Sequence, residues 1–499
     1  MTWRLSFIFL LFSFSLSAQV YFLPLGNAYR TSVLNAVNHS DTTFIHTGWQ
    51  PLNISSLNGV QDSSFVFTLR QQKDTLHNGL LRHLKYENLL LYHEKGFTLR
   101  MDLLMKFEGG RETETIRYNP FINTRGIIFR GDIAKHFSFE SRFYENQAFY
   151  PEYVRKAIGQ TYVAPGQGRV RGFKSYGFDF SSAAGWLSYK PWQWLNFQFG
   201  NGKNFIGEGY RSLLLSDNPF TYPFAKITVS HGRFQYTSMF TSFVGVRSYD
   251  NISIVHQKQH GSYHYLNTFL TSRWQVGLFE GIIWHTATAD YHNYDFPPTY
   301  FVPIIFLNTA IYGLSSKHKA LLGLNSSYKI SKTFRVYGQL AVDAPDSSTQ
   351  KQWGYQLGGY CFNPLGIKNL LLQAEYNYTE EGLYQPVSVP VSLAERPGWY
   401  YYGQPLAHPQ GSGFAEWLVR GRYVLHDFFV DFHYDVSKAV ADNTLLTYQA
   451  ASVGYIINHA TNLQLYIGTS RRTTTSPTYD GLFIFGGLKT NLNNYYYDF

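Results

Sequence analysis

The chain has 499 residues, a formal net charge of +9 and 18% aromatic residues, with 40 Tyr and 41 Phe. No long Lys/Arg run is present, which argues against a nucleic-acid-binding protein. The single cysteine, Cys361, excludes an internal disulfide. After residue 18 no stretch is apolar enough for a transmembrane helix, yet the aromatic content is well above what we expect of a soluble protein.

The N-terminus has the three regions of a secretory signal peptide in their usual order. Met1–Arg4 gives a short positive start, an apolar run follows from Leu5 to Leu16, and Leu16-Ser17-Ala18 offers a small-residue cleavage site. We therefore predict that residues 1–18 are a signal peptide and that the mature chain starts at Gln19. No cysteine follows the signal, which argues against a lipid anchor.

The region from residue 19 to 96 alternates poorly between polar and apolar residues. Leu34–Asp41 and Leu76–His83 allow short helices. We expect a small, partly helical periplasmic segment before the first strand.

From residue 97 to 499 the dominant pattern has a period of two, which is typical of strands. Phe428–Val436 places apolar or aromatic residues at even positions and Asp431, His433 and Asp435 at odd positions. Similar alternation runs through segments that contain Leu370–Thr379 and Leu463–Ile467. A soluble β-sandwich or propeller would also alternate, but we expect aliphatic inner positions there and an internal repeat in a propeller. Aromatics on one face and charges on the other favour a transmembrane barrel.

The length of this region sets the number of strands. Tilted spans need about 9–11 residues, and alternating short and long connections bring each strand to roughly 20–25 residues. We therefore predict an all-β fold: an antiparallel outer-membrane β-barrel of about 16 to 18 strands. Such a barrel has an aqueous lumen unless loops fold into it.

The stretch from Val163 to Lys226 is the least regular part of the barrel region, with glycines, charges and the turn sequence Ser216-Asp217-Asn218-Pro219. Its glycines fit tight backbone packing better than ligand contact. The charged residues Lys203, Glu208, Arg211 and Asp217 could pair with one another inside the lumen or contact a sugar. Tyr210 and Tyr222 could stack on sugar rings, although packing or a place in the aromatic girdle is favoured.

The chain ends with alternating aromatics at Tyr495, Tyr497 and Phe499. We expect this tail to be the last barrel strand, with the three rings on one face toward lipid. An ordinary edge strand that ends in Phe is the alternative.

Two blocks resemble a known family. Lys203–Asn218 and Tyr402–Pro409 are similar to the Wzi-type capsule-assembly family, and most of all to the Bacteroidetes branch labelled gliding-motility protein RemB. Asn38–Thr42 is a third, weaker block. Order and spacing fit over essentially the whole mature chain. The resemblance implies an 18-stranded outer-membrane barrel with a small periplasmic helical element, which attaches or organises surface polysaccharide as a lectin, or has a role in gliding motility.

These observations define the candidate site and partners. A polysaccharide-binding or lumen network is expected at Arg169, Lys203, Asn204, Glu208, Tyr210, Arg211, Ser216, Asp217, Asn218, Tyr222, Gln404 and His408. The expected partners are surface polysaccharide, outer-membrane lipid and lipopolysaccharide, and the barrel-assembly machinery during insertion, with no nucleic acid. The expected location is the bacterial outer membrane, reached through the periplasm.

Catalysis finds no support in the sequence. There is no Gly-x-Ser-x-Gly motif, and His93-Glu94 lacks the second histidine of a zincin. Asp431 and His433 share a face without a third partner in sequence, so that a metal site is not expected. We predict no enzymatic activity and no cofactor. The alternative function is an outer-membrane channel, a porin or a component of an export assembly.

Overall fold

The computed structural model describes most of the chain. The described residues are 22–40, 44–53, 57, 79–114, 117–134, 136–249, 253–284, 298–314, 318–343, 351–385, 398–490 and 492–499. The predicted signal peptide, residues 1–18, lies outside the described residues. Within them, no helix combines the length and the apolar character needed to cross a membrane.

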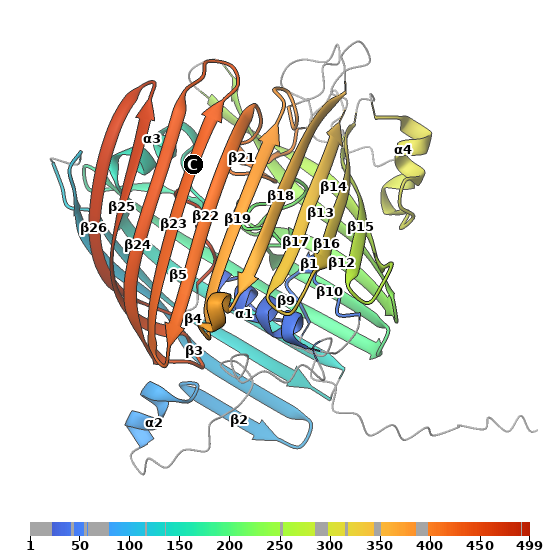
Figure 1. The fold of residues 1–499 in the computed structure, drawn as a ribbon, viewed down its shortest axis with the longest axis horizontal. Coiled ribbons are helices and arrows are strands. Elements are labelled where there is room, and N and C mark those ends of the chain that lie inside the picture. Colours follow the sequence, from blue (N-terminus) through green and yellow to red (C-terminus); the bar gives the residue numbers. More distant parts are fainter. Residues whose placement is uncertain are drawn as a thin grey trace, which may run out of the picture.

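Eighteen antiparallel strands form one closed barrel, in agreement with the predicted fold (Figure 1). Each strand pairs with its neighbours along the chain, and β26 closes the ring by pairing with β3, with Lys489 opposite Lys106 and Phe483 opposite Glu112. The strands of the ring are β3 (Phe97–Glu112), β4 (Phe121–Ile133), β5 (Phe137–Phe149), β9 (Gly177–Trp192), β10 (Leu195–Gly202), β12 (Tyr222–His231), β13 (Phe234–Tyr249), β14 (Ser253–Phe269), β15 (Trp274–Trp284), β16 (Lys319–Lys329), β17 (Phe334–Asp343), β18 (Gln352–Phe362), β19 (Leu370–Thr379), β22 (Phe414–Leu425), β23 (Phe428–Ala439), β24 (Leu445–Asn458), β25 (Leu463–Thr475) and β26 (Thr478–Lys489).

Side-chain alternation places apolar residues on the outside of the barrel, as predicted. In β23, Phe428 is 62% exposed, and Val430, Phe432 and Tyr434 share its face, while Asp435 is fully buried. In β25, Ile467 on the outer face is 64% exposed. An apolar outer band around a polar interior is what a membrane barrel requires, because successive strand residues point alternately to lipid and lumen.

The two ends of the barrel differ in their connections. At one end the strands are joined by tight turns, such as 193–194 and 232–233, and at the other by long segments such as 150–176 and 380–413. Outer-membrane barrels place short turns in the periplasm and long loops outside the cell. We therefore assign the short-turn end to the periplasmic face and the long-loop end to the cell surface.

The lumen is filled by three parts of the chain. From the N-terminal region come α1 (Asn27–His39), which Figure 1 shows inside the short-turn end, and β1 (Trp49–Gln50). Residues 203–221, here called the inner segment, leave the wall after β10 and return at β12. Residues 492–499, here called the tail, enter the lumen after β26. A large apolar cluster joins the inner segment (Leu213, Leu214) to wall residues such as Tyr263 and to loop residues such as Trp399.

The tail corrects one expectation from the sequence. Residues 492–499 form no strand, and Tyr496 and Asp498 are 3% and 2% exposed inside the lumen. The barrel is closed by β26, ten residues earlier, so the terminal aromatics do not face lipid. The tail alternates because one side faces the inner segment and the other faces α3 (Glu152–Thr161) and β5. Period two alone does not distinguish this arrangement from a paired strand.

Helix α1 of the N-terminal region is bonded to the barrel wall. Asn38 Nδ2 donates to the carbonyls of Ser331 and Lys332 at 3.0 and 2.6 Å, which holds α1 to the turn between β16 and β17. Leu34 packs on the inward rings of Tyr337 and Tyr360. Helix α2 (Gly79–Lys85) and strand β2 (Leu90–Glu94) lie outside the ring, and β2 pairs with β3 and with no other strand among the described residues.

One surface segment covers part of the outer wall. Helix α4 (Leu307–Tyr312) lies outside the barrel beside β15 (Figure 1). The outward-facing carboxylate of Glu280 on β15 accepts hydrogen bonds from the backbone N–H groups of Phe306 and Thr309 at 2.6 and 3.0 Å. This buried acid therefore anchors the start of α4 to the wall.

Candidate functional site

The inner segment spans the lumen and is buried along its length, from residue 203 to 219. Gly207 adopts a φ of +123°, and a Cβ there would lie 2.3 Å from Gln339 Nε2. A Cβ on Gly209 would lie 2.5 Å from a carboxylate oxygen of Glu375. The sequence Gly207-Glu208-Gly209 thus allows the backbone to approach the inward side chains of β17 and β19, which confirms the packing role predicted for these glycines.

Inward polar side chains of the wall hold this backbone in place. Gln339 donates to the carbonyl of Ile206 at 2.9 Å and accepts from the N–H of Leu213 at 2.8 Å. The carboxylate of Glu375 accepts the N–H groups of Tyr210 and Arg211 at 2.8 and 3.2 Å. Backbone groups that leave a sheet need such partners when they are buried.

Arg211 is the centre of a buried ion cluster. Its guanidinium contacts Glu416 on β22 at 3.0 Å, Asp435 on β23 at 2.9 Å and Asp498 of the tail at 3.1 Å. Burial acts to lower the pKa of Arg211, but the carboxylates of Asp498, Glu416 and Asp435 outweigh it and raise that pKa. The arginine therefore stays charged and links the inner segment, two wall strands and the tail.

His408 extends this cluster from the loop between β19 and β22. Its Nε2 lies 2.8 Å from Glu416, and its Nδ1 accepts the N–H of Gln410 at 3.3 Å. Burial lowers the pKa of His408 in spite of the raising effect of Glu416. The imidazole is therefore neutral, with Nε2–H donating to the carboxylate, and is used as a hydrogen-bonding group.

The other charged residues of the inner segment also find partners within the chain. Lys203 donates to the backbone carbonyl of Asp217 at 2.8 Å, and burial lowers the pKa of Lys203 to about 7, although Asp217 raises it. The side chain of Asp217 accepts from Tyr496 at 2.6 Å and from Asn494 at 3.0 Å, both in the tail. Glu208 accepts a hydrogen bond from Thr47 and lies 3.5 Å from Arg335.

Of the two alternatives left open for these four charged residues, the structure places them in a network inside the lumen, but their side chains pair with other parts of the chain and not with one another. Only Lys203 and Asp217 meet, and through a backbone carbonyl. The carboxylates that pair with Arg211 come from strands and from the tail. The inner segment folds back on itself, with the N–H of Ile206 donating to the carbonyl of Leu215 at 2.8 Å, and, Lys203 apart, its charged side chains point to the wall, the N-terminal region and the tail.

The remaining predicted site residues are also placed by the fold. Asn204 accepts from Trp49 and Lys226, both at 3.1 Å. Ser216 and Asn218 bond to backbone carbonyls of the 404–407 region, and Gln404 accepts from the N–H of Phe220. Tyr210 and Tyr222 are buried in the lumen and pack on other rings, so that a place in the girdle is wrong for both. Of the twelve residues only Arg169 is exposed.

Arg169 belongs to a surface at the long-loop end that carries cations and accessible rings. Its guanidinium carbon lies 6.0 Å from the ring centre of Tyr402. On the same loop, between β5 and β9, Tyr162 is 57% exposed and Lys174 lies 5.3 Å from the ring centre of Phe173. Nearby, Tyr176 stacks on Tyr118 and accepts a hydrogen bond from Arg117. We call Arg117, Tyr162, Arg169, Lys174, Tyr176 and Tyr402 the loop-end surface.

Several wall residues of the site were not predicted as members. Glu375, Glu416, Asp435 and Asp498 hold the inner segment through Arg211 and its backbone. The signal that could have found the first three is present in the sequence, since an ionised residue in the middle of an alternating strand must face the lumen and needs a partner there. Their partner was not predictable, because the sequence does not say where the inner segment crosses.

The described part of the chain also contains one group with the ligand spacing of a metal site: His433, Asp435 and Asp498 offer donor atoms within 4.8 Å of one another. Two of these three carboxylate and imidazole groups already contact Arg211. A guanidinium at 2.9–3.1 Å disfavours a metal cation at the same place.

Comparisons with known proteins were informative at the level of structure only. No protein-family model and no curated protein sequence matches this chain. Among solved structures, Wzi of Escherichia coli, an outer-membrane protein involved in group 1 capsule assembly and a carbohydrate-binding β-barrel, aligns with a TM-score of 0.60 and 12% identity, over 95% of this chain and 100% of that chain.

Outer-membrane barrels of Pseudomonas aeruginosa align less well. OccK8 (OprE) gives a TM-score of 0.47 and 9% identity over 79% of this chain and 98% of that chain, and OpdK gives 0.46 and 9% over 79% and 98%. The protein is thus an 18-stranded outer-membrane β-barrel whose fold is similar to that of the Wzi barrel.

Proposed function

We propose that this protein binds or organises cell-surface polysaccharide and does so without catalysis. The observation that carries the proposal is the loop-end surface, where cationic and aromatic side chains are accessible together on the side of the barrel that we assign to the cell exterior. Aromatic faces stack on pyranose rings, and arginines and lysines pair with acidic sugars. The fold similarity to a carbohydrate-binding barrel supports the same function.

The inner segment contributes to this function as a support and not as the contact surface. Its polar groups are buried and bonded within the chain, so a polymer cannot reach them while the lumen is filled. Ser216 and Asn218 bond to the carbonyls of Pro405 to Ala407, and Gln404 bonds to Phe220. These contacts fix the short hairpin β20 (Tyr400–Tyr401) and β21 (Gln404–Pro405) that presents Tyr402.

The cellular setting of the polysaccharide is part of the proposal. Capsule assembly and gliding motility are the two settings implied by the resemblance of Lys203–Asn218 and Tyr402–Pro409 to the Wzi-type family and its Bacteroidetes, RemB-labelled branch. A deletion strain scored for both capsule retention and surface spreading separates them. Lipid and lipopolysaccharide are the expected neighbours of the apolar outer band, and the barrel-assembly machinery is the expected partner during insertion.

The test is polysaccharide binding by purified, folded protein. We expect Arg169→Ala combined with Tyr402→Ala to weaken binding of the native surface polysaccharide by about tenfold or more, since a charged hydrogen bond and a stacking contact are lost. Arg471→Ala is the matched control, because Arg471 is an exposed arginine near the same end of the barrel and pairs with Asp480. Equal binding by the double variant, the control and the unmodified protein would count against the proposal.

Ion conductance distinguishes the proposed polysaccharide-binding barrel from the alternative, an outer-membrane channel. The buried inner segment and α1 favour a filled lumen over a diffusion pore, because residues 203–219 cross it and bond to β17, β19, β22 and β23. A planar bilayer with the purified protein is expected to show no stable ion current. A stable open-state current of porin size would favour the channel.

A further inference from the structure

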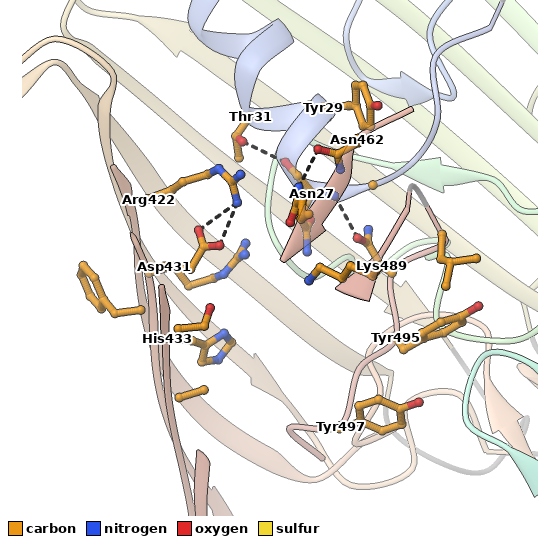
Figure 2. Close-up of a pocket in the computed structure, with 18 of the residues that line it drawn as sticks. Asn27, Tyr29, Thr31, Arg422, Asp431, His433, Asn462, Lys489, Tyr495 and Tyr497 are labelled. Atoms are coloured by element: carbon orange, nitrogen blue, oxygen red, sulfur yellow. Dashed lines mark hydrogen bonds and ion pairs between the residues drawn. The ribbon is translucent and has the colours of Figure 1, made fainter. Parts of the chain in front are cut away.

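A second polar cavity lies inside the lumen, away from the loop-end surface. It has a volume of about 350 Å³ and is bounded by the first turn of α1, by residues of β3, β19 and β22 to β26 and by the tail. Figure 2 shows Asn27 of α1, Asp431 and His433 of β23, Lys489 of β26 and Tyr495 and Tyr497 of the tail around it. No residue of the loop-end surface lines this cavity.

The charged side chains of the cavity are mostly cations. Lys106, Arg420, Arg422 and Lys489 line it, whereas Asp431 is the only carboxylate among its described lining residues. All four cations come from inward positions of strands, so their charges converge on one space. Water-filled space of this kind inside a low-dielectric wall concentrates the field of its charges.

Two of these cations are already paired and two are not. Arg422 contacts both oxygens of Asp431, at 3.0 and 2.8 Å, and Lys106 lies 3.1 Å from Glu108. Arg420 packs over the ring of Tyr210 at 4.0 Å and Lys489 over the ring of Tyr466 at 4.5 Å. Neither forms an ion pair with a carboxylate in the described part of the chain, and Arg420 Nε is buried without a hydrogen-bond partner there.

Glu108 is paired with Lys106, and the other nearby carboxylates do not neutralise this space. Asp435 and Asp498 lie beyond His433, and both are bonded to Arg211 at 2.9 and 3.1 Å. Neither lines the cavity. The excess of positive charge at the cavity is therefore local, and it is not cancelled by the acidic cluster that holds the inner segment.

Neutral groups at the rim add to the preference for an anion. Gly26 and Asn27, at the beginning of the 13-residue helix α1, line the cavity, and the first turn of α1 carries no acidic residue. The amides of Asn462 and Asn493 also line it. The N–H of Asn27 already donates to Asn494 Oδ1 at 2.8 Å, and Asn494 Nδ2 donates to Leu25 and Asp217. The contribution of the rim is therefore the positive end of the helix dipole and the amides of Asn462 and Asn493, which favour a negative ligand when basic side chains already select for one.

Access is available from the short-turn end. A second cavity of about 760 Å³ is lined by the turns around 367–371 and 423–427 and by Thr31, Ser32 and Asn35 of α1. The two cavities share Thr31, Leu371 and Arg422 and are therefore adjacent. A ligand entering between α1 and these turns reaches Arg422 first and then Lys489.

We propose that this cavity binds one oxyanion, a carboxylate or phosphate group carried by a small molecule or by one sugar residue, on the periplasmic side of the plugged lumen. Arg420 and Lys489 supply the two positive charges that lack a carboxylate partner among the described residues. Arg422, which is paired with Asp431, supplies further N–H donors to the oxyanion. The volume is within the range of small-ligand sites and matches about one sugar residue. The carboxylate of a hexuronic acid and a phosphate group are the two sources of this chemistry.

The test is isothermal titration calorimetry, in which the full detergent-solubilised protein is titrated with sodium glucuronate, with inorganic phosphate and, as a neutral control, with glucose. We expect saturable binding of at least one anion, none of glucose, and weaker binding as salt is raised. Tighter binding of glucuronate identifies an acidic sugar as the source, and tighter binding of phosphate identifies a phosphate group. Each variant is first checked for folding by heat-modifiable gel migration.

We expect the variants to change the affinity for the anion in opposite directions. Lys489→Met and Arg420→Met are each expected to weaken anion binding about tenfold or more, since each removes a charged donor. Asp431→Asn is expected to tighten it severalfold, because Arg422 loses its carboxylate partner. Lys438→Met and Arg471→Met, at exposed positions, are the matched controls and are expected to bind as the unmodified protein does. The proposal is overturned if neither anion binds saturably, or if Lys489→Met and Asp431→Asn leave the affinity unchanged.

Discussion

Arg211 is the residue whose loss should have the largest effect on the plugged lumen. Replacing it with Met keeps a long side chain in place but removes the one cation that contacts Glu416, Asp435 and Asp498. The three carboxylates are at most 3% exposed at their side chains. Water cannot take over the role of the guanidinium without movement of the inner segment or the tail.

The size of the effect follows from these contacts. Removing one partner of a buried ion pair costs about 3–5 kcal/mol, because the other partner keeps its charge without compensation. Here one cation serves three acids, which would raise the cost, but Asp498 lies one residue from the chain end and the tail can move away. We therefore expect Arg211→Met to lower the free energy of unfolding by about 3–5 kcal/mol. Arg211→Lys keeps the charge but not the forked geometry, and is expected to lose less.

The assay is urea unfolding of the protein in lipid vesicles, followed by tryptophan fluorescence, with bilayer conductance as a second readout. Trp399 donates to the carbonyl of Leu214 at 3.0 Å and is one of the ten tryptophans whose summed fluorescence follows unfolding. Arg471→Met is the matched control, and its exposed pair with Asp480 is expected to contribute nothing measurable. The destabilisation should shrink at acid pH, because burial without Arg211 raises the pKa of Asp498 and its protonation removes a buried charge.

The reasoning is refuted if Arg211→Met unfolds at the same urea concentration as the unmodified protein at neutral pH and shows no added conductance. A loss of stability that does not depend on pH would point to packing and not to uncompensated charge.

Three further predictions concern single positions. Burial lowers the pKa of Lys203 to about 7 from an ordinary value of 10.5. Between these two pH values the unfolded chain therefore binds one proton more than the folded protein, so the free energy of unfolding should rise with pH from about 7 to 10.5. Lys203→Met should remove that rise. Gly207→Ala should destabilise the protein by about 1–3 kcal/mol, through its positive φ and the clash with Gln339, whereas Gly172→Ala, with open space around it, should not. Glu280→Ala should release α4 from the outer wall, measured as faster amide exchange at 306–312.

Each of these has a contrary outcome. An unchanged slope of stability against pH between about 7 and 10.5 in Lys203→Met would show that a group other than Lys203 titrates in this range. A Gly207→Ala variant as stable as Gly172→Ala would mean that the backbone at this point relaxes freely. Amide exchange at 306–312 that is equal with and without Glu280 would show that packing of Tyr300, and not the carboxylate, holds this segment.

The strands and their faces were predictable from the sequence because each residue in a membrane barrel meets one of two solvents. Val430 and Phe432 face lipid and Asp431 and Asp435 face the lumen, and the alternation records this directly. The strand number followed to within a range of about 16 to 18, since the length of each span is set by the thickness of the bilayer. The start of the first ring strand at Phe97 was read from the same pattern.

The contents of the lumen were not predictable in the same way. The tail alternates like a strand, yet it lies beside the inner segment, where Tyr496 and Asp498 bond to Asp217 and Arg211. The partners of Arg211 are separated from it by more than 200 residues in sequence. Local periodicity carries no information on contacts between such distant segments.

The sequence by itself determined that this chain forms a closed outer-membrane sheet with an apolar outside and a charged inside, and that one stretch of it is irregular and rich in glycine. Only the tertiary structure decided that this stretch fills the lumen, that β26 and not the chain end closes the barrel, and that Lys106, Arg420, Arg422 and Lys489 share one cavity. The physical reason is that burial in lipid acts on each residue separately, whereas charge pairing and packing inside the lumen act between residues that only the closed barrel brings together.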